Sequence, residues 1–192
     1  MMIYSKKDNQ SYALDYREVA PFKATETMFL DNLGNVDTQL SRFSILSTGV
    51  PGTLAGLDAA HKKFGILNFS ELIDPSIQLA KKGFIVTKEL SSTLKKYESH
   101  LKKYKSTKKI FYKGSKYYEP GDKLKQKELA NTLQTIKQLG VKDFYNGQLG
   151  KKFIAYMKQN GSIMTLKDLA QYQAVFRQPI IGTYKQHKVV SM

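Results

Sequence analysis

The residues with the clearest potential for chemistry lie in one short segment, Asp15-Tyr16-Arg17-Glu18-Val19-Ala20-Pro21. Two acids flank an arginine near the end of an alternating, strand-like run, and a proline follows. A guanidinium donates two parallel hydrogen bonds to a carboxylate, which an ammonium cannot do. From the residues alone the segment has two interpretations. It is either a local ion pair at a strand end or an arginine held by acidic neighbours for a small carboxylate ligand.

Other residue types that carry catalysis or bind metals form no comparable pattern. Cysteine is absent, which excludes disulfides, thiolate metal sites and a cysteine nucleophile. His61, His100 and His187 lack metal-ligand spacing, and the glycines at 49, 52 and 56 lack the lysine and spacing of a phosphate-binding loop. The sequence therefore predicts no metal site and no cofactor.

Hydrophobic periodicity predicts the elements that must position Arg17. Strands are expected at both ends of the chain and helices between them, which indicates an α+β fold. The segment of residues 49–57 is interpreted as a turn and packing element. Expected strands are 2–4, 11–17 and a pair within 179–192; expected helices are 52–64, 69–82 with a kink or start at Asp74-Pro75, one capped by Thr87, 125–139, 148–159, and a short one after the Thr165–Asp168 capping box.

Positive charge is abundant, with a formal net charge of +15. Such a charge is compatible with a nucleic acid or an anionic surface as partner. Only three of the 31 basic residues are arginine, however, and arginine dominates base and phosphate recognition. The lysines are therefore interpreted as a solvated surface, and no nucleic-acid partner is expected. Residues 102–123 are expected to be an exposed loop with a small strand pair, while Tyr97 and Tyr104, at helical spacing, are expected in the core.

The order of several motifs along nearly the whole chain resembles the γ-glutamyltranspeptidase family. The arginine segment is similar to that family's D-[FY]-R-E-x-A-P motif. Further resemblances follow in chain order: Ala24-Thr25 with Met28–Asp31, Gly49–Leu57, Pro75–Phe84, Gln126 to Ile136, Asp143–Gly147, Gly161 to Leu169, and Gly182 to Met192. No single motif is decisive, but chance does not readily place this many in the right order.

The resemblance implies a fold and an activity. Members are N-terminal-nucleophile hydrolases with an αββα fold, whose precursor cleaves itself into a large and a small subunit. The new N-terminal threonine is the nucleophile, and the enzyme transfers or hydrolyses the γ-glutamyl group of glutathione and related amides. By position, Arg17 matches the family arginine that binds the α-carboxylate of that group. Bacterial members are usually periplasmic or secreted.

The resemblance also implies what residues 1–192 leave out. They are expected to form a single unit, an internal fragment of the large subunit, beginning after the family's glycine-rich segment and ending before its P-P-P-S-S-G-G segment. Substrate-binding Arg17 is then present, no catalytic residue is, and the isolated chain is expected to be inactive. The partners are the missing small subunit and a γ-glutamyl substrate. The alternatives are a related amidase or acylase, and a cationic module that binds nucleic acid. No apolar run reaches the roughly 18 residues of a membrane span, and the N-terminus does not resemble a signal peptide.

Overall fold

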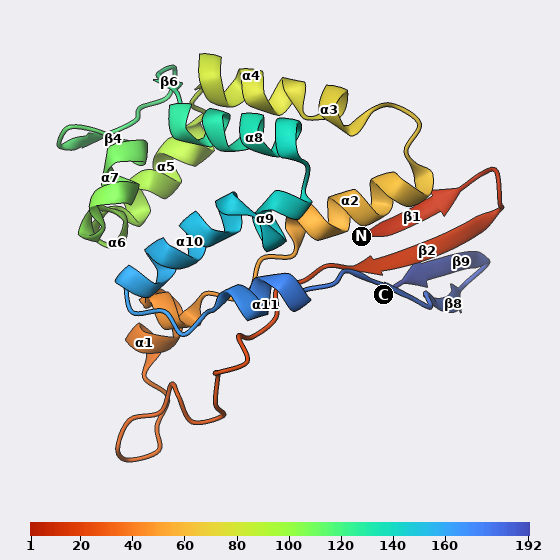
Figure 1. Ribbon diagram of the computed structural model, residues 1–192, viewed down its shortest axis with the longest axis horizontal. Helices are drawn as coiled ribbons and strands as arrows, with labels where there is room; N and C mark the ends of the chain where they lie inside the picture. Colours follow the sequence, from red (N-terminus) through yellow and green to blue (C-terminus); the bar gives the residue numbers. More distant parts are fainter. The chain divides into compact units, whose positions relative to one another are not determined.

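The computed structural model describes all residues from 1 to 192, and these form two compact units. The first contains residues 1–66 and 141–192, and the second contains residues 67–140. No Gly/Ser-rich linker marks either boundary, which is why the sequence alone predicts one unit. Strands lie near both ends of the chain and helices dominate its middle, so the predicted α+β class is confirmed (Figure 1).

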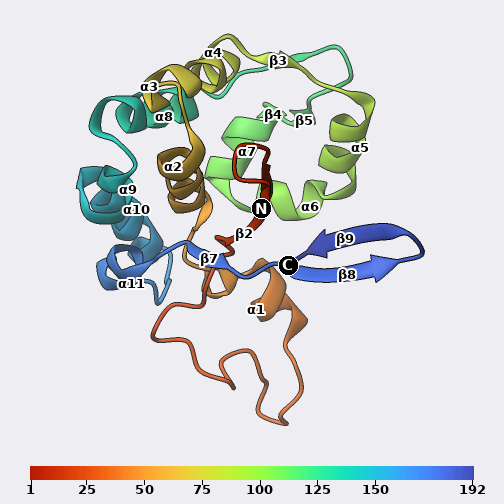
Figure 2. The ribbon, with the colours of Figure 1, turned by 90° about the vertical axis from the view of Figure 1, so that its right-hand side faces the viewer.

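A three-stranded antiparallel sheet organises the first unit. Its strands are β1 (Met2–Ser5), β2 (Gln10–Asp15) and β7 (Val175–Arg177), in the order β1-β2-β7. Leu14 on the central strand faces Phe176 and is fully buried. The strands β8 (Ile180–Tyr184) and β9 (His187–Ser191) form a separate hairpin beyond β7 (Figure 2). The two ends of the chain meet at the end of β2, where the arginine segment begins: the amino group of Met1 donates to Leu14 O and to the sulfur of Met192.

Several of the most buried side chains of the first unit lie in its C-terminal part, and this unit also contains five helices and a 3-10 turn. They are α1 (Thr38–Phe43), the 3-10 turn η1 (Ile45–Ser47), α2 (Thr53–Phe64), α9 (Lys142–Asn146), α10 (Gln148–Gln159) and α11 (Leu166–Gln171). The helix α9 packs against both α10 and α11. Ile154, Met157, Met164 and Leu169 are almost entirely buried and belong to the core of the first unit.

The second unit is mainly helical. It contains α3 (Phe69–Leu72), α4 (Asp74–Lys82), β3 (Phe84–Ile85), α5 (Lys88–Lys96), α6 (Glu98–Lys103), α7 (Lys105–Phe111), β4 (Tyr112–Lys113), β5 (Lys116–Tyr117), β6 (Lys123–Leu124) and α8 (Lys127–Leu139). The helices α4 and α8 pack side by side through Ile77, Ala80, Ala130 and Ile136 (Figure 1). Lys137 on α8 pairs with Asp74 at the start of α4, with Nζ and Oδ1 2.6 Å apart. No helix of the chain is both long and apolar enough to cross a membrane.

Most predicted elements are confirmed, with shifts at their ends. Thr87 caps α5 by accepting from Leu90 N, the break before α4 falls next to Pro75, and Thr165 and Asp168 form the predicted capping box. The first-unit strand predicted to reach residue 17 ends at Asp15. The short elements α1, α9 and β7 were not predicted, because each is too short to show a period.

Two predictions for the second unit are wrong. Residues 105–111 form the helix α7 instead of a loop, although the small strand pair that follows it, β4 with β5, is confirmed. Tyr97 and Tyr104 each expose 43% of their surface, whereas Tyr112 is buried and donates a hydrogen bond from its hydroxyl to Leu94 O. Because α5 stops at Lys96, the helical period that placed both tyrosines in the core does not continue through them.

Candidate functional site

Arg17 lies two residues beyond the end of β2, and its backbone is held on both sides. Its N–H donates to Asp15 Oδ1 at 3.1 Å, and its carbonyl oxygen accepts from the hydroxyl of Tyr172 at 2.8 Å. The side chain is 82% exposed. Both of these hydrogen bonds use the backbone of Arg17, so they restrict the region that the guanidinium can reach. They leave the donor groups of the guanidinium itself unused.

The two acidic neighbours of Arg17 have different roles. Asp15 does not pair with the Arg17 guanidinium: its Oδ2 accepts from Arg177 Nε on β7 at 2.7 Å. Hydrogen bonds from Arg17 N and from Arg177 hold the pKa of Asp15 below its usual value. Glu18 does approach the guanidinium, with its Oε1 3.2 Å from one terminal nitrogen, but both side chains are largely exposed. Exposed pairs of this kind contribute about 0–1 kcal/mol, so an incoming carboxylate can displace Glu18 at little cost.

Two stacked tyrosines support the arginine segment from below. The rings of Tyr172 and Tyr145 lie 5.9 Å apart at an angle of 17°. Tyr145 donates to Pro51 O at 2.8 Å and accepts from Ala55 N, which fixes the start of α2. Burial raises the pKa of Tyr145 to about 12, and burial followed by the nearby charges of Asp15 and Glu18 raises the pKa of Tyr172. Both phenols therefore stay protonated at neutral pH and keep donating.

Glycines in the 49–57 segment allow the arginine segment to approach α2 closely. A Cβ atom on Gly52 would lie 2.2 Å from Tyr16 O and 1.9 Å from the Tyr172 hydroxyl. A Cβ on Gly56 would lie 2.2 Å from the ring of Tyr16, and one on Gly49 would lie 2.8 Å from Glu18 Cγ. These separations are far below a van der Waals contact, which agrees with the predicted packing role of this segment.

The downstream end of the arginine segment is anchored as well. Val50 N donates to Val19 O at 2.8 Å, and Phe22 N donates to Asp168 Oδ1 at 2.6 Å. Asp168 is only 4% exposed, and its other oxygen accepts from the backbone N–H and the hydroxyl of Thr165. Burial raises the pKa of Asp168, but these hydrogen bonds outweigh burial and bring the pKa below its usual value.

A pocket of about 250 Å³ has Arg17 among its lining residues. It is lined by Met1, Leu14, Asp15, Tyr16, Arg17, Glu18, Thr53 and Met192. Arg17 is the one basic side chain among these lining residues, so the pocket offers a forked cation to a small anion.

Comparison with known proteins identifies the family of the chain. The family model described as gamma-glutamyltranspeptidase matches residues 1–192. This chain belongs to the γ-glutamyltranspeptidase family. The glutathione hydrolase proenzyme of Escherichia coli (strain K12) is 42% identical over 193 residues, which cover 100% of this chain and 33% of that protein. The chain thus spans about a third of the length of this curated relative.

Solved γ-glutamyltranspeptidases share the fold of the chain. The crystal structure of the Helicobacter pylori enzyme matches with a TM-score of 0.95 and 45% identity, covering 100% of this chain and 55% of that one. The Pseudomonas nitroreducens enzyme complexed with L-DON matches with a TM-score of 0.91 and 38% identity, covering 100% and 55%. The resemblance inferred from the motifs is therefore confirmed.

Sequence reasoning singled out Arg17 and its acidic neighbours, but it missed the distant residues that hold the arginine segment, residues 15–21, in place. Tyr172 lies 155 positions away in the chain, and Asp168 lies 146 positions from its partner Phe22. The capping box at Thr165 marked Asp168 only as a helix start. The unusual density of glycines at 49, 52 and 56 was the available signal that a neighbouring backbone approaches closely.

Proposed function

We propose that the full-length protein containing this chain is a γ-glutamyltransferase and glutathione hydrolase, and that Arg17 binds the α-carboxylate of the γ-glutamyl group. The observation that carries the proposal is the exposed Arg17 guanidinium, set on a backbone fixed by Asp15 and Tyr172 in a family of glutathione hydrolases. Family membership supports the reaction class, and the geometry supports the role of the arginine.

The chemistry of the guanidinium suits this role. An α-carboxylate presents two oxygens in a plane, and a guanidinium matches them with two parallel N–H donors. Binding the carboxylate at a fixed point places the γ-amide several bonds away at a defined distance and angle. Arg17 would therefore accelerate the reaction by positioning the scissile bond, and it would take no part in making or breaking it.

We propose Tyr172 as the residue that positions Arg17. Its hydroxyl donates a hydrogen bond to the carbonyl of Arg17, so it would act on substrate through the backbone. The ring of Tyr145 limits the rotation of Tyr172 by stacking on it, and Gly52 leaves the space that the hydroxyl occupies. Asp15 supports the same peptide from its other side while being held by Arg177.

The remaining parts of the reaction are proposed from the family alone. The nucleophile is an N-terminal threonine released by autocatalytic cleavage of a precursor, and it belongs to a small subunit outside residues 1–192. Residues 1–192 then form a fragment of the large subunit that is inactive by itself. Turnover of a γ-glutamyl anilide by the pure chain, above a heat-killed control, would refute this part. A periplasmic or secreted location is proposed on the same basis, and cell fractionation tests it.

The role of Arg17 is tested in the full-length protein by release of the anilide from γ-glutamyl-p-nitroanilide. Arg17→Lys keeps the charge but removes the fork, so kcat/KM should fall on the order of 10²-fold for a lost contact of a few kcal/mol. Lys63→Arg, on the exposed end of α2, is a matched control that should leave kcat/KM within about twofold. If the wild type processes itself but ignores γ-glutamyl substrates, an amidase or acylase function replaces the proposal and Arg17 is a structural ion pair.

A further inference from the structure

The lysines of the chain are concentrated in one segment of the second unit. Residues 95–127 hold twelve of the 28 lysines, three acidic residues and no arginine. The rest of the second unit, residues 67–94 and 128–140, carries four lysines and four acids and is electrically balanced. A general bias toward lysine would raise both parts alike. The excess charge therefore belongs to this segment specifically, and we call the exposed side chains of residues 95–127 the lysine-rich surface.

Most of these lysines have no carboxylate to neutralise them. Three are paired, Lys102 with Glu98, Lys109 with Glu128 and Lys113 with Asp122. The other nine take part in no salt bridge. Lys103, Lys105, Lys108, Lys125 and Lys127 are all exposed. Unpaired like charges on one segment repel one another, so they favour binding of a partner that supplies many negative charges.

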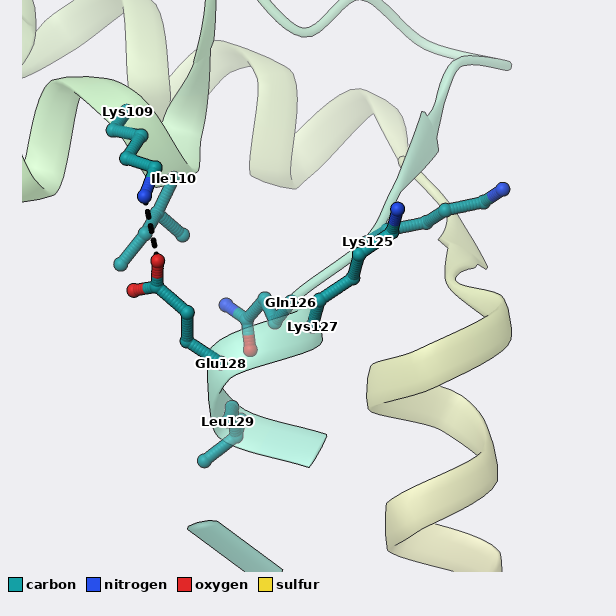
Figure 3. Close-up of a pocket in the computed structure, with 7 residues that line it drawn as sticks. All are labelled: Lys109, Ile110, Lys125, Gln126, Lys127, Glu128 and Leu129. Atoms are coloured by element: carbon teal, nitrogen blue, oxygen red, sulfur yellow. Dashed lines mark hydrogen bonds and ion pairs between the residues drawn. The ribbon is translucent and has the colours of Figure 1, made fainter. Parts of the chain in front are cut away.

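Apolar groups are exposed among the lysines. A pocket of about 470 Å³ lies between α7 and the start of α8, lined by Ile110, Leu129, Gln126, the Lys109–Glu128 pair, Lys125 and Lys127 (Figure 3). Tyr97 and Tyr104 within this segment, and Leu129 just beyond it on α8, each expose 43% of their surface. The ammonium groups of Lys96 and Lys103 lie over the rings of Tyr97 and Tyr104. The surface thus mixes cations, tyrosine rings and apolar side chains within one group of short elements.

We propose that the lysine-rich surface binds the surface of an anionic lipid bilayer. Lysines near such a surface are attracted to its headgroups without needing a fixed geometry, while exposed tyrosine and leucine side chains enter the interfacial region. Recognition of nucleic acid would favour arginine, which is absent from the segment. The proposal concerns peripheral attachment of the protein and is independent of the γ-glutamyl reaction.

The expected strength follows from the number of lysines. Each lysine close to an anionic bilayer strengthens binding about fivefold at low salt, so removal of four should weaken binding by roughly two orders of magnitude or more. Raising the salt from a low to a physiological concentration shortens the screening length to about 8 Å, so it should also weaken the binding of the wild type.

The experiment uses the full-length protein and sedimentation with vesicles of phosphatidylcholine alone or with 30% phosphatidylglycerol. The test variant replaces Lys105, Lys108, Lys125 and Lys127 by Gln. A matched control with the same net charge replaces Lys6, Lys7, Lys151 and Lys152, which are exposed in the first unit and form no salt bridge. A third variant replaces the four lysines of the test variant by Arg, which keeps the charge. Each protein is also tested for γ-glutamyl-p-nitroanilide turnover as a check of folding.

The proposal expects the wild type to bind only the anionic vesicles, with an affinity that falls as salt rises. The test variant should bind these vesicles about 100-fold or more weakly. The affinity of the control should change little, and the Arg variant should keep the wild-type affinity. Equal loss in test and control variants would overturn it, because net charge alone would then explain binding. Absence of binding, or equal binding to neutral vesicles, would also overturn it. So would tighter binding to duplex DNA than to anionic vesicles at the same salt, which would favour a nucleic-acid partner.

Discussion

Two regions of this molecule use positive charge in opposite ways. Around Arg17, one guanidinium stands on a backbone whose N–H and carbonyl are both hydrogen-bonded, and long-range contacts from Tyr172 and Asp168 hold the segment. In the lysine-rich surface, twelve ammonium groups lie between the end of α5 and the start of α8, and nine lack a salt bridge.

The difference is between one placed charge and a density of charge. A single cation selects a small anion only if its position is fixed, because the binding energy depends on two hydrogen bonds with a defined direction. Many flexible cations attract an extended anionic surface through their summed field, which tolerates movement of each one. Substitutions near Arg17 should therefore have large individual effects, and substitutions in the lysine-rich surface small ones.

The largest structural effect is expected from Gly52→Ala in the full-length protein. The new methyl group would overlap Tyr16 O and the Tyr172 hydroxyl, so we expect a loss of about 1–3 kcal/mol in stability. Displacement of Arg17 by even 1 Å could lower kcat/KM by up to about 10²-fold. Kinetics with γ-glutamyl-p-nitroanilide and urea unfolding measure the two effects. Gly182→Ala is the control, since a Cβ there meets nothing within 4 Å; equal results for both variants would contradict the account.

Asp168→Asn should come next, at about 1–3 kcal/mol, because the amide cannot accept all the hydrogen bonds that the buried carboxylate accepts. The pKa of Asp168 is lowered in the folded state, so its contribution is present above the unfolded value of 3.8 and is lost as the pH falls below it. Urea unfolding should show a wild-type advantage at pH 7 that shrinks near pH 3. Exposed Glu26→Gln serves as control, and an advantage that is the same at both pH values would argue against this role of the charge.

A smaller, more specific effect is expected from Tyr172→Phe. The variant keeps the stack on Tyr145 but loses the hydrogen bond to Arg17 O, which corresponds to about 0.5–1.5 kcal/mol or roughly a two- to tenfold change. Since Arg17 would bind the carboxylate in both states and would also set the position of the scissile amide, we expect KM to rise and kcat to fall together. Tyr184→Phe, in which an exposed ring loses its hydroxyl, should change neither. A fall in kcat at constant KM would assign Tyr172 a different role.

The smallest effect on catalysis is expected from the four-lysine variant of the lysine-rich surface. Its γ-glutamyl-p-nitroanilide kcat/KM should stay within about twofold of the wild type, and its stability within about 0.5 kcal/mol, because these side chains are exposed and lack a carboxylate partner. A tenfold loss of kcat/KM would remove the distinction between the two regions.

The sequence predicted those parts of the fold that repeat a local period or carry a local cap. The helices α2, α8 and α10, the Thr165 capping box and both terminal hairpins follow from patterns within about fifteen residues. Gly83, Gly140 and Gly161 follow helix ends with positive φ, the backbone conformation that favours glycine, whereas Gly65 follows α2 with an extended backbone at φ −71°. The helix α7 was missed because its lysine-rich sequence has no clear apolar stripe.

The candidate site was only half predictable for the same reason. Arg17 was found because its neighbours form a recognisable motif, but the residues that fix it come from the other end of the chain. The sequence indicated Asp15 only as one of two acidic neighbours of Arg17, whereas in the structure its side chain pairs with Arg177, because β7 lies beside β2. The contact between Asp15 and Arg177 depends on the pairing of β2 with β7, which a local sequence pattern does not predict.

The central claim is that Arg17 binds the α-carboxylate of the substrate, and a comparison of two substrates tests it most directly. The full-length wild type and Arg17→Ala would be assayed with γ-glutamyl-p-nitroanilide and with 4-aminobutanoyl-p-nitroanilide, which lacks only the α-carboxylate. The account predicts that the wild type prefers the first substrate on the order of 10²-fold in kcat/KM and that the variant retains a preference of no more than about threefold. A variant that loses activity but keeps the full preference would contradict the claim, because the carboxylate would then be recognised elsewhere.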